Sequence, residues 1–586
     1  MRWTWVFFVL LVSFLAYVPS VGNDFTWDDR LIAAAEADGA TNDLVAHVHP
    51  VSDYFRHHYW HGRARASRLY RPITILSFAL GNRVCGRSAN AAHWINTVLN
   101  VVCTWLVILI LLRLRLPWQP ACLGALAFGL HALHSEAVIG IVGRSELLGF
   151  AFGATGLLLF LQATRRSALW RAVLLALAAA AYFVGCCSKE SALAWLPFSV
   201  CVAAARTWQR GIRVRIQRRH APEIVALLVP AIAFLALRYF VLAQFGDTDL
   251  TTTALENPLM DLGLSARVMT ATMIWGWALL LTLFPFSLSS EYGMGVFPIV
   301  AGPHSIAFPW FFLAAAVFAC LLAAALLWRR RFPLLFVVVA CWMGFSFVVS
   351  NIPAAVTLTF GERNYYAPSF AIAVLVAWLA SAVRLRANST QAAFGAATFG
   401  AWLGACGLVI AHRTSAWKSN ATLVAADLAN HPNSVRLLLC RGQEQLAAGL
   451  YIAATRTFER AARGDPGYAD SWSKLGIALH NRGQNMEAIA AFDRALHCRP
   501  RSLRNIEGEV YLNRGLALAK LGRSADAIAA FERARLLGKG ARVIAHVADR
   551  ALRRIADDDD APASLRTRAR VLRSGRSRGT AAPPGR

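Results

Sequence analysis

The chain has 586 residues, of which 57% are hydrophobic, and a mean hydropathy of +0.45, which together exclude an ordinary soluble domain. Its formal net charge of +27 could suggest a nucleic-acid binder, but much of the charge lies in short Arg clusters between apolar runs and in the tail after Arg550, as in the cytoplasmic loops of membrane proteins. The eleven cysteines form no CxxC pair and no regular spacing, so neither a zinc site nor a disulfide framework is indicated.

The first apolar stretch runs from about Trp5 to Val21 after Arg2, and we expect it to be a retained signal anchor rather than a cleaved signal sequence. A polar loop over 22–69 follows, and the half-apolar segment 70–80 is too short to cross and is expected at the membrane interface. Apolar runs of spanning length then recur from about residue 92 to residue 411. This pattern predicts a multi-pass membrane protein.

The Arg clusters predict which loops share one side of the membrane. They place the loop 22–69 on the luminal or extracytoplasmic side, together with the loops that hold 134–136, 188–190 and 247–261. Simple alternation of the spans fails at the cluster 329–331. The segment 266–288, which contains Pro285, is therefore predicted to be re-entrant.

The first loop carries two adjacent acids, Asp28 and Asp29, just beyond the first span. A carboxylate there could accept a proton from an acceptor hydroxyl, and the alternative is a solvated loop in which an acid caps the helix that starts at Leu31. His57 and His61 would share a helix face in the same loop. Because no Cys or matched carboxylate accompanies them, no metal site is predicted.

A polar strip lies at the mouths of two adjoining spans and contains His134, Glu136, Arg144 and Glu146. Ionisable groups at membrane depth usually line a cavity or a site. We favour a phosphate or sugar site over a metal site, because Arg144 attracts an anion and a further metal ligand is missing.

Further ionisable residues fall at other span ends, where each pair could be a simple ion pair at the membrane surface or part of one shared site. These candidate residues are Arg71, Lys189, Glu190, Glu362, Arg363 and Tyr366. Their common side with the acidic pair of the first loop favours a single active cavity, although Arg and Tyr are also common interfacial anchors.

The hydropathy falls after the last span, and a period of 34 residues appears, which is the length of a tetratricopeptide helix pair. We predict residues 1–412 as the membrane domain and 413–540 as a repeat domain. The three expected repeats cover 435–468, 469–502 and 508–541. The charged tail 557–586 is predicted to be disordered. Asn420 begins a glycosylation sequon that a luminal location would expose.

Taken together, these motifs resemble the tetratricopeptide-bearing transmembrane O-mannosyltransferases that act on cadherins, members of the GT-C glycosyltransferase clan. The resemblance runs over nearly the whole chain. It rests on the motifs Phe25-Thr-Trp-Asp-Asp-Arg30, Tyr70-Arg-Pro-Ile-Thr74, His93-Trp-Ile-Asn96, His131-Ala-Leu-His-Ser-Glu-Ala-Val138 with Gly143-Arg144, Lys189-Glu190, and Glu362-Arg363-Asn-Tyr-Tyr-Ala-Pro-Ser369. The sequence departs from the family at Glu291-Tyr292, where an Asp-Trp pair is typical.

The resemblance implies an all-α fold, with a polytopic GT-C-type membrane domain followed by a soluble tetratricopeptide solenoid. It implies a multi-pass protein of the endoplasmic reticulum membrane that transfers mannose from dolichyl phosphate mannose to Ser or Thr hydroxyls of luminal proteins, with inversion and without a metal or other cofactor. Asp28 and Asp29 match the catalytic acidic pair of the family.

Other roles are assigned from charge and position. Arg71, Arg144, Lys189 and Arg363 are the candidates for the donor phosphate. The expected pocket residues are His134, Glu136, Glu146, Glu190, Glu362 and Tyr366. The repeats would present the protein acceptor, and no nucleic-acid partner is expected. Two alternatives stay open: a GT-C enzyme that uses another polyprenyl phosphate sugar, and a non-enzymatic membrane-anchored repeat scaffold.

Overall fold

The structure is a computed structural model that describes residues 2–33, 36–37, 40–61, 69–163, 166–212, 220–244, 254–386, 389–503, 506–537, 542–557 and 562–574. The chain forms two compact units. The first comprises 1–252, 259–292 and 298–430, and the second comprises 253–258, 293–297 and 431–586. Each unit is described separately.

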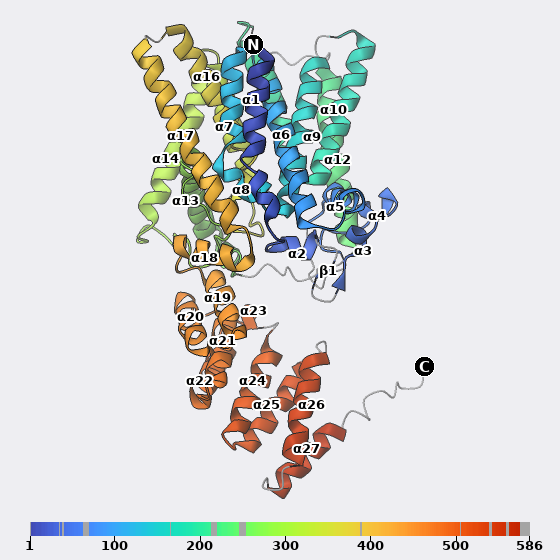
Figure 1. Cartoon of the computed structure of the whole chain (residues 1–586), viewed down its shortest axis with the longest axis vertical. Helices are drawn as coiled ribbons and strands as arrows, with labels where there is room; N and C mark the ends of the chain where they lie inside the picture. Colours follow the sequence, from blue (N-terminus) through green and yellow to red (C-terminus); the bar gives the residue numbers. More distant parts are fainter. Residues whose placement is uncertain are drawn as a thin grey trace. The chain divides into compact units, whose positions relative to one another are not determined.

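The first unit is a set of long apolar helices that run side by side (Figure 1). Eight helical segments of the described chain are long and apolar enough to cross a membrane, or nine if one bent pair counts as a single span. The eight contain α1 (Arg2–Leu15) with η1 (Val18–Gly22), α6 (Ala89–Arg113), η3 (Ile141–Gly143) with α9 (Arg144–Ala163), α10 (Ala168–Ser188), α12 (Ala221–Ala243), α13 (Leu264–Leu283), α14 (Phe308–Leu327) and α17 (Ser389–Ala416). The predicted multi-pass character is confirmed.

Shorter elements connect these spans. They are α5 (Pro72–Cys85), α7 (Trp118–Gly129), η2 (Ala132–His134), α8 (Ser135–Val138), η4 (Glu190–Ala194), α11 (Trp195–Trp208), η6 (Pro258–Asp261), α15 (Pro333–Phe347), η7 (Glu362–Tyr365), α16 (Phe370–Arg386) and α18 (Asn420–Asn430). Most of the candidate site residues lie in or beside these short elements.

The structure departs from the predicted spans at two places. The segment 266–288 was expected to be re-entrant, but α13 is an unbroken apolar helix that ends at Leu283, before Pro285. The broken segment is instead α7 with η2 and α8, where the helix axes differ by 47°. The break falls at His131, whose ring nitrogen accepts the Leu133 backbone N–H, so a side chain takes over a bond that a continuous helix would make.

The first polar loop folds against the membrane helices as a small packed layer. It contains α2 (Asp28–Ile32), a short hairpin of β1 (Glu36–Ala37) and β2 (Ala40–Thr41), α3 (Asp43–Ala46) and α4 (Val51–Phe55). Its buried residues Ile32, Val45 and Tyr54 share one apolar cluster with Phe78 of α5 and Ile141 of η3. This packing holds α2, and with it the acidic pair, against the start of α9.

The second unit is a solenoid of helix pairs, as the 34-residue period predicts. Its helices are α19 (Val435–Ala447), α20 (Tyr451–Gly464), α21 (Ala469–Asn481), α22 (Asn485–Leu496), α23 (Pro500–Leu503), α24 (Glu507–Lys520), α25 (Ser524–Leu537), α26 (Arg542–Ala556) and α27 (Ala563–Ser574). Within the second pair, Gly476 faces the Phe492 ring so closely that an added Cβ would lie 2.5 Å from it. The all-α architecture, a helical membrane part followed by a repeat solenoid, is confirmed.

The prediction of a disordered tail from residue 557 needs a correction. Residues 563–574 form α27, which packs on α26 and α25. Ala569 is fully buried in this packing, and Arg570 donates a hydrogen bond to the Ala556 carbonyl at 3.3 Å. Small and apolar residues at helical spacing among the arginines give this segment a face to bury, so composition alone is misleading here. Residues 575–586 lie outside the described residues.

Candidate active site

The two acids of the first loop begin α2 but have different surroundings. Asp29 is 1% exposed, and its carboxylate accepts hydrogen bonds from the Val142 N–H at 2.8 Å and from the N–H and hydroxyl of Thr26, both at 3.3 Å. Burial outweighs these bonds and raises the pKa of Asp29 from 3.8 to about 6. Asp29 therefore ties α2 to η3.

Asp28 has a side chain that is 29% exposed, and its ion-pair partner is Arg363 of η7, with a nearest nitrogen–oxygen distance of 3.8 Å. Of the two acids, Asp28 is thus the one whose carboxylate can meet an incoming hydroxyl. The sequence motif treats the acids as equivalent, and the structure separates an anchoring acid from an accessible one.

Arg363 links Asp28 to Glu136. Its side-chain Nε lies 3.5 Å from Glu136 Oε1, and its backbone N–H donates to Glu136 Oε2 at 2.8 Å. Burial alone would lower the pKa of Arg363, but the carboxylates of Glu136 and Asp28 outweigh this effect and raise it. The guanidinium is therefore charged at any physiological pH, and at 22% exposure it can be reached from outside.

Two further ion pairs lie in the neighbouring elements. Lys189 Nζ lies 2.5 Å from Glu146 Oε1 and donates to the Asn364 side chain at 3.3 Å. Arg71 Nε donates to Glu190 Oε2 at 2.9 Å, and the Glu190 carboxylate also accepts the Tyr70 N–H. Burial would raise the pKa of Glu190, but Arg71 and then Lys189 overcome it and lower that pKa.

Each of these ion pairs joins a cation to an acid of another loop or helix end. The sequence strip at residues 134–146 therefore meets the loops at 189–190 and 362–366, as a shared site requires. Each cation of the cluster is paired with an acid. A bound anion would compete with those acids for the most accessible cation, which is Arg363 by exposed fraction (22%, against 11% for Arg71 and 7% for Lys189).

Arg144 occupies a different position from the one expected for a phosphate ligand. It is 1% exposed, stacks 4.6 Å from the Phe78 ring centroid, and donates to the Asn96 side chain and to the carbonyls of Ser77 and Ala92 at 2.9–3.2 Å. Protein acceptors thus engage all three guanidinium nitrogens. We interpret Arg144 as a clamp between α5, α6 and α9 and correct the expectation that it binds the donor phosphate.

His134 and Tyr366 are also interior residues. Their rings lie 4.1 Å apart, His134 Nε2 lies 2.7 Å from the Ser369 hydroxyl, and Tyr366 donates its hydroxyl hydrogen to Asn100 at 2.8 Å. Both side chains are completely buried. They support the segment that carries Arg363 and do not line an accessible surface, so their predicted role as pocket residues is replaced by a packing role.

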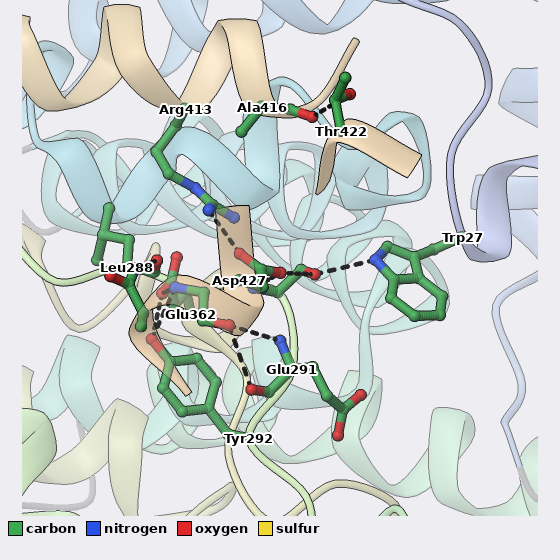
Figure 2. A network of polar contacts seen from close by, with 12 residues as sticks. Trp27, Leu288, Glu291, Tyr292, Glu362, Arg413, Ala416, Thr422 and Asp427 are labelled. Atoms are coloured by element: carbon green, nitrogen blue, oxygen red, sulfur yellow. Dashed lines mark hydrogen bonds and ion pairs between the residues drawn. The ribbon is translucent and has the colours of Figure 1, made fainter. Parts of the chain in front are cut away.

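Glu362 belongs to a buried polar network that the sequence reasoning missed (Figure 2). Its carboxylate accepts the Tyr292 hydroxyl and the Ser289 N–H, both at 2.5 Å. Burial raises the pKa of Glu362 to about 8, against the opposing effect of Arg413. Glu362 is therefore a largely protonated interior group at neutral pH, and its predicted place among the pocket residues is replaced by a place in this network.

The same network continues to α18. Arg413 at the end of α17 donates to Asp427 at 2.7 Å, and both side chains are buried. Asp427 accepts the backbone N–H of Ser290 at 2.9 Å and also its hydroxyl. A charged residue in the last turn of an apolar helix was the available sequence signal for Arg413, but its partner in α18 could not be read from spacing.

The described residues contain no cluster of three or more His, Cys, Asp or Glu side chains arranged to hold a metal ion. The rings of His57 and His61 in the first loop lie close together, with centroids 3.9 Å apart and a tilt of 43° between their planes. The geometry supplies a partly exposed carboxylate, Asp28, next to the charged guanidinium of Arg363. That pair suits proton acceptance from a hydroxyl beside an anionic group.

Comparisons with known proteins agree on the class of chain. Residues 457–490 match the family described as "Tetratricopeptide repeat". The chain is 24% identical over 492 residues to the mouse protein O-mannosyl-transferase TMTC3, an alignment that covers 79% of this chain and 52% of the relative. A protein O-mannosyl-transferase of Caenorhabditis elegans is 25% identical over 483 residues, with 78% and 62% covered.

A shorter stretch of 146 residues is 32% identical to the Drosophila melanogaster protein O-mannosyl-transferase Tmtc1 and covers 23% of this chain and 16% of that protein. Among solved structures, the archaeal oligosaccharyltransferase AglB from Archaeoglobus fulgidus aligns with 73% of this chain and 56% of its own, at 14% identity and a TM-score of 0.35. The chain spans between about half and three fifths of the length of the first two relatives.

Proposed function

We propose that this chain, whose curated homologues are protein O-mannosyl-transferases of the TMTC family, is a membrane glycosyltransferase that moves mannose from dolichyl phosphate mannose to Ser or Thr hydroxyls. The observation that carries the proposal is the pairing of the partly exposed Asp28 carboxylate with the charged Arg363 guanidinium. Asp28 lies in the loop that follows the first span and Arg363 lies in η7, outside the spans, where a lipid-borne donor would be met.

In the proposed reaction the acceptor hydroxyl oxygen attacks the anomeric carbon of the donor. Asp28 takes the hydroxyl proton as the new carbon–oxygen bond forms, and the bond between the sugar and the phosphate oxygen breaks on the opposite face, which inverts the configuration. Dolichyl phosphate leaves with the bonding electron pair. The Arg363 guanidinium faces the developing charge on that phosphate, and Arg71 and Lys189 are secondary candidates.

The surrounding residues hold this pair. Glu136 fixes Arg363 through two contacts, and Asp29 fixes α2 to η3. No cofactor enters the proposed reaction, because the donor already carries its leaving group. We place the protein in the endoplasmic reticulum membrane, with the first loop on the luminal side, and assign presentation of the protein acceptor to the repeats.

The test is rescue of protein O-mannosylation in cells that lack this protein. Wild type should restore the missing O-mannosyl sites and Asp28→Asn should not, although it should accumulate to the same level. Asp43→Asn is the matched control, since Asp43 lies in the same loop with a side chain that is 68% exposed and pairs with His49. If cells that lack the protein keep an unchanged O-mannose profile, the proposal that it transfers mannose is refuted.

The donor is tested in membranes supplied with labelled donor and an extracellular cadherin domain. Dolichyl phosphate mannose should support transfer, and dolichyl phosphate glucose should not. Arg363→Gln should raise the apparent KM for the donor by about tenfold or more, because it removes a charge-assisted contact with the phosphate. If transfer occurs from glucose alone, the reaction class stands and the donor assignment falls; if neither donor supports transfer, the scaffold alternative gains.

A further inference from the structure

Trp27, the residue immediately before Asp28, has an unusual backbone. Its φ is 45° and its ψ is −124°, a conformation that glycine adopts easily and a residue with a Cβ does not. A strained residue of this kind persists only where its surroundings hold it. The strain is next to the proposed base, so the contacts that hold Trp27 also decide where Asp28 points.

Those contacts come from residues far along the chain. The backbone N–H of Trp27 donates to the side-chain oxygen of Asn420 at 2.8 Å, and its indole N–H donates to the Ser290 hydroxyl at 2.9 Å. Ser290 is held in turn by Asp427, and Asp427 by the buried Arg413 (Figure 2). The two bonds fix both the peptide group and the ring of Trp27.

Asp28 therefore lies between two anchored residues. On one side Asn420 and Ser290 hold Trp27, and on the other side Asp29 is bonded to Val142. If the first anchor is lost, the Trp27 peptide can relax to an ordinary conformation and rotate the Asp28 carboxylate, while α2 stays attached at Asp29. A shift of about 1 Å at a reacting group can lower a rate by about a hundredfold.

We propose that Asn420, Ser290 and Asp427 are positioning residues of the transfer reaction, because they hold Trp27 in its strained backbone and thereby aim the Asp28 carboxylate. This inference rests on the proposed function, in which Asp28 is the base. It assigns to Asn420 a role that differs from the glycan attachment its sequon suggests. The hydrogen bonds from Trp27 to Asn420 and Ser290 affect Asp28 through the backbone, and neither residue has to contact a substrate.

The first experiment separates the hydrogen bond of Asn420 from its sequon. Asn420→Ala removes both, Asn420→Asp keeps the accepting oxygen and removes the sequon, and Thr422→Ala removes the sequon and keeps Asn420. We expect kcat to fall by about ten- to a hundredfold in Asn420→Ala with an unchanged donor KM. Asn420→Asp and Thr422→Ala should keep kcat within about threefold of wild type.

The second experiment tests the strain itself. Trp27→Ala and Trp27→Gly both lose the indole bond to Ser290, but glycine accepts the observed φ and alanine does not. We expect Trp27→Gly to have a kcat about tenfold higher than Trp27→Ala. Ser290→Ala should lower kcat less than Trp27→Ala, because it removes the same indole hydrogen bond but keeps the indole ring.

All variants are assayed as the full chain in membranes, with labelled dolichyl phosphate mannose and a cadherin domain, after a check of their thermal midpoint. The inference is overturned if Asn420→Ala keeps the wild-type kcat, or if Thr422→Ala or Asn420→Asp loses as much kcat as Asn420→Ala does. It is also overturned if the loss is in KM rather than kcat, or if the kcat of Trp27→Gly is no higher than that of Trp27→Ala. Asp28→Asn in the same assay tells the two proposals apart: if it is active, the base assignment fails, and if it is inactive while Asn420→Ala is normal, the positioning role alone fails.

Discussion

The two acids of the first loop should respond to substitution in opposite ways. Asp28→Asn removes one ion pair between partly exposed groups at 3.8 Å, which contributes at most about 1 kcal/mol to stability. As the proposed general base, however, Asp28 supplies a factor of about 10²–10⁴ in rate, or roughly 3–5 kcal/mol of transition-state stabilisation. We expect transfer to be lost with a thermal midpoint within a few degrees of wild type.

Asp29→Asn should lower transfer by less than about tenfold, because the amide oxygen can still accept the Val142 N–H. The main effect of Asp29→Asn should be on how the stability of the protein depends on pH. The pKa of Asp29 is raised from 3.8 to about 6, so the folded state binds a proton more tightly than the unfolded chain between these values, and stability falls as pH rises through this window. A difference of about two pKa units corresponds to about 3 kcal/mol of folding stability, which wild type loses across this window and the neutral amide of Asp29→Asn does not.

The assay pairs labelled-mannose transfer with thermal unfolding in detergent at several pH values. The stability of Asp29→Asn relative to wild type should increase by up to about 3 kcal/mol between pH 4 and pH 7.5, and that of Asp28→Asn should stay nearly constant. If Asp29→Asn abolished transfer while Asp28→Asn kept more than a tenth of it, the buried carboxylate of Asp29 would be the base and the assignment of Asp28 would be refuted.

Three further predictions concern stability. Lys189→Met should destabilise the protein by about 3–5 kcal/mol, because it leaves the buried Glu146 carboxylate without its ion-pair partner. The double variant with Glu146→Leu should recover much of the loss in the thermal midpoint. Equal losses in the single and double variants would contradict this. The thermal midpoint of wild type should fall as pH rises from about 4.5 to about 8, because burial raises the folded pKa of Glu362 from 4.5 to about 8. Glu362→Gln should flatten that fall, and a parallel curve in the variant would speak against this assignment. Gly476→Ala should lower the free energy of unfolding by about 1–3 kcal/mol and make the repeats more sensitive to limited proteolysis, because the new Cβ meets the Phe492 ring at 2.5 Å. Gly483→Asn, at an uncrowded turn with a φ of 82°, serves as the control. Unchanged proteolysis of Gly476→Ala would argue against that packing.

The charged residues show why the site could be located but not assigned from sequence. Arg144, Lys189 and Arg363 all follow or precede apolar runs, and hydropathy treats them alike. In the folded chain Arg144 is surrounded by Asn96 and backbone carbonyls, and Arg363 is left partly exposed. The difference depends on which acceptors the neighbouring helices bring, and no local pattern records it.

The sequence by itself determined the apolar helices, the 34-residue repeat and the adjacent acids after the first span, because hydropathy and helical period are properties of neighbouring residues. Only the tertiary structure decided that Asp29 is an anchor and Asp28 is accessible. It also decided that Ser290 and Asn420 reach Trp27 of the first loop across 263 and 393 residues of chain, and that Asp427 holds Ser290. The physical reason is that burial and hydrogen-bond partners are set by packing between distant segments, where one helix rotation or one displaced loop exchanges a solvated carboxylate for a buried one.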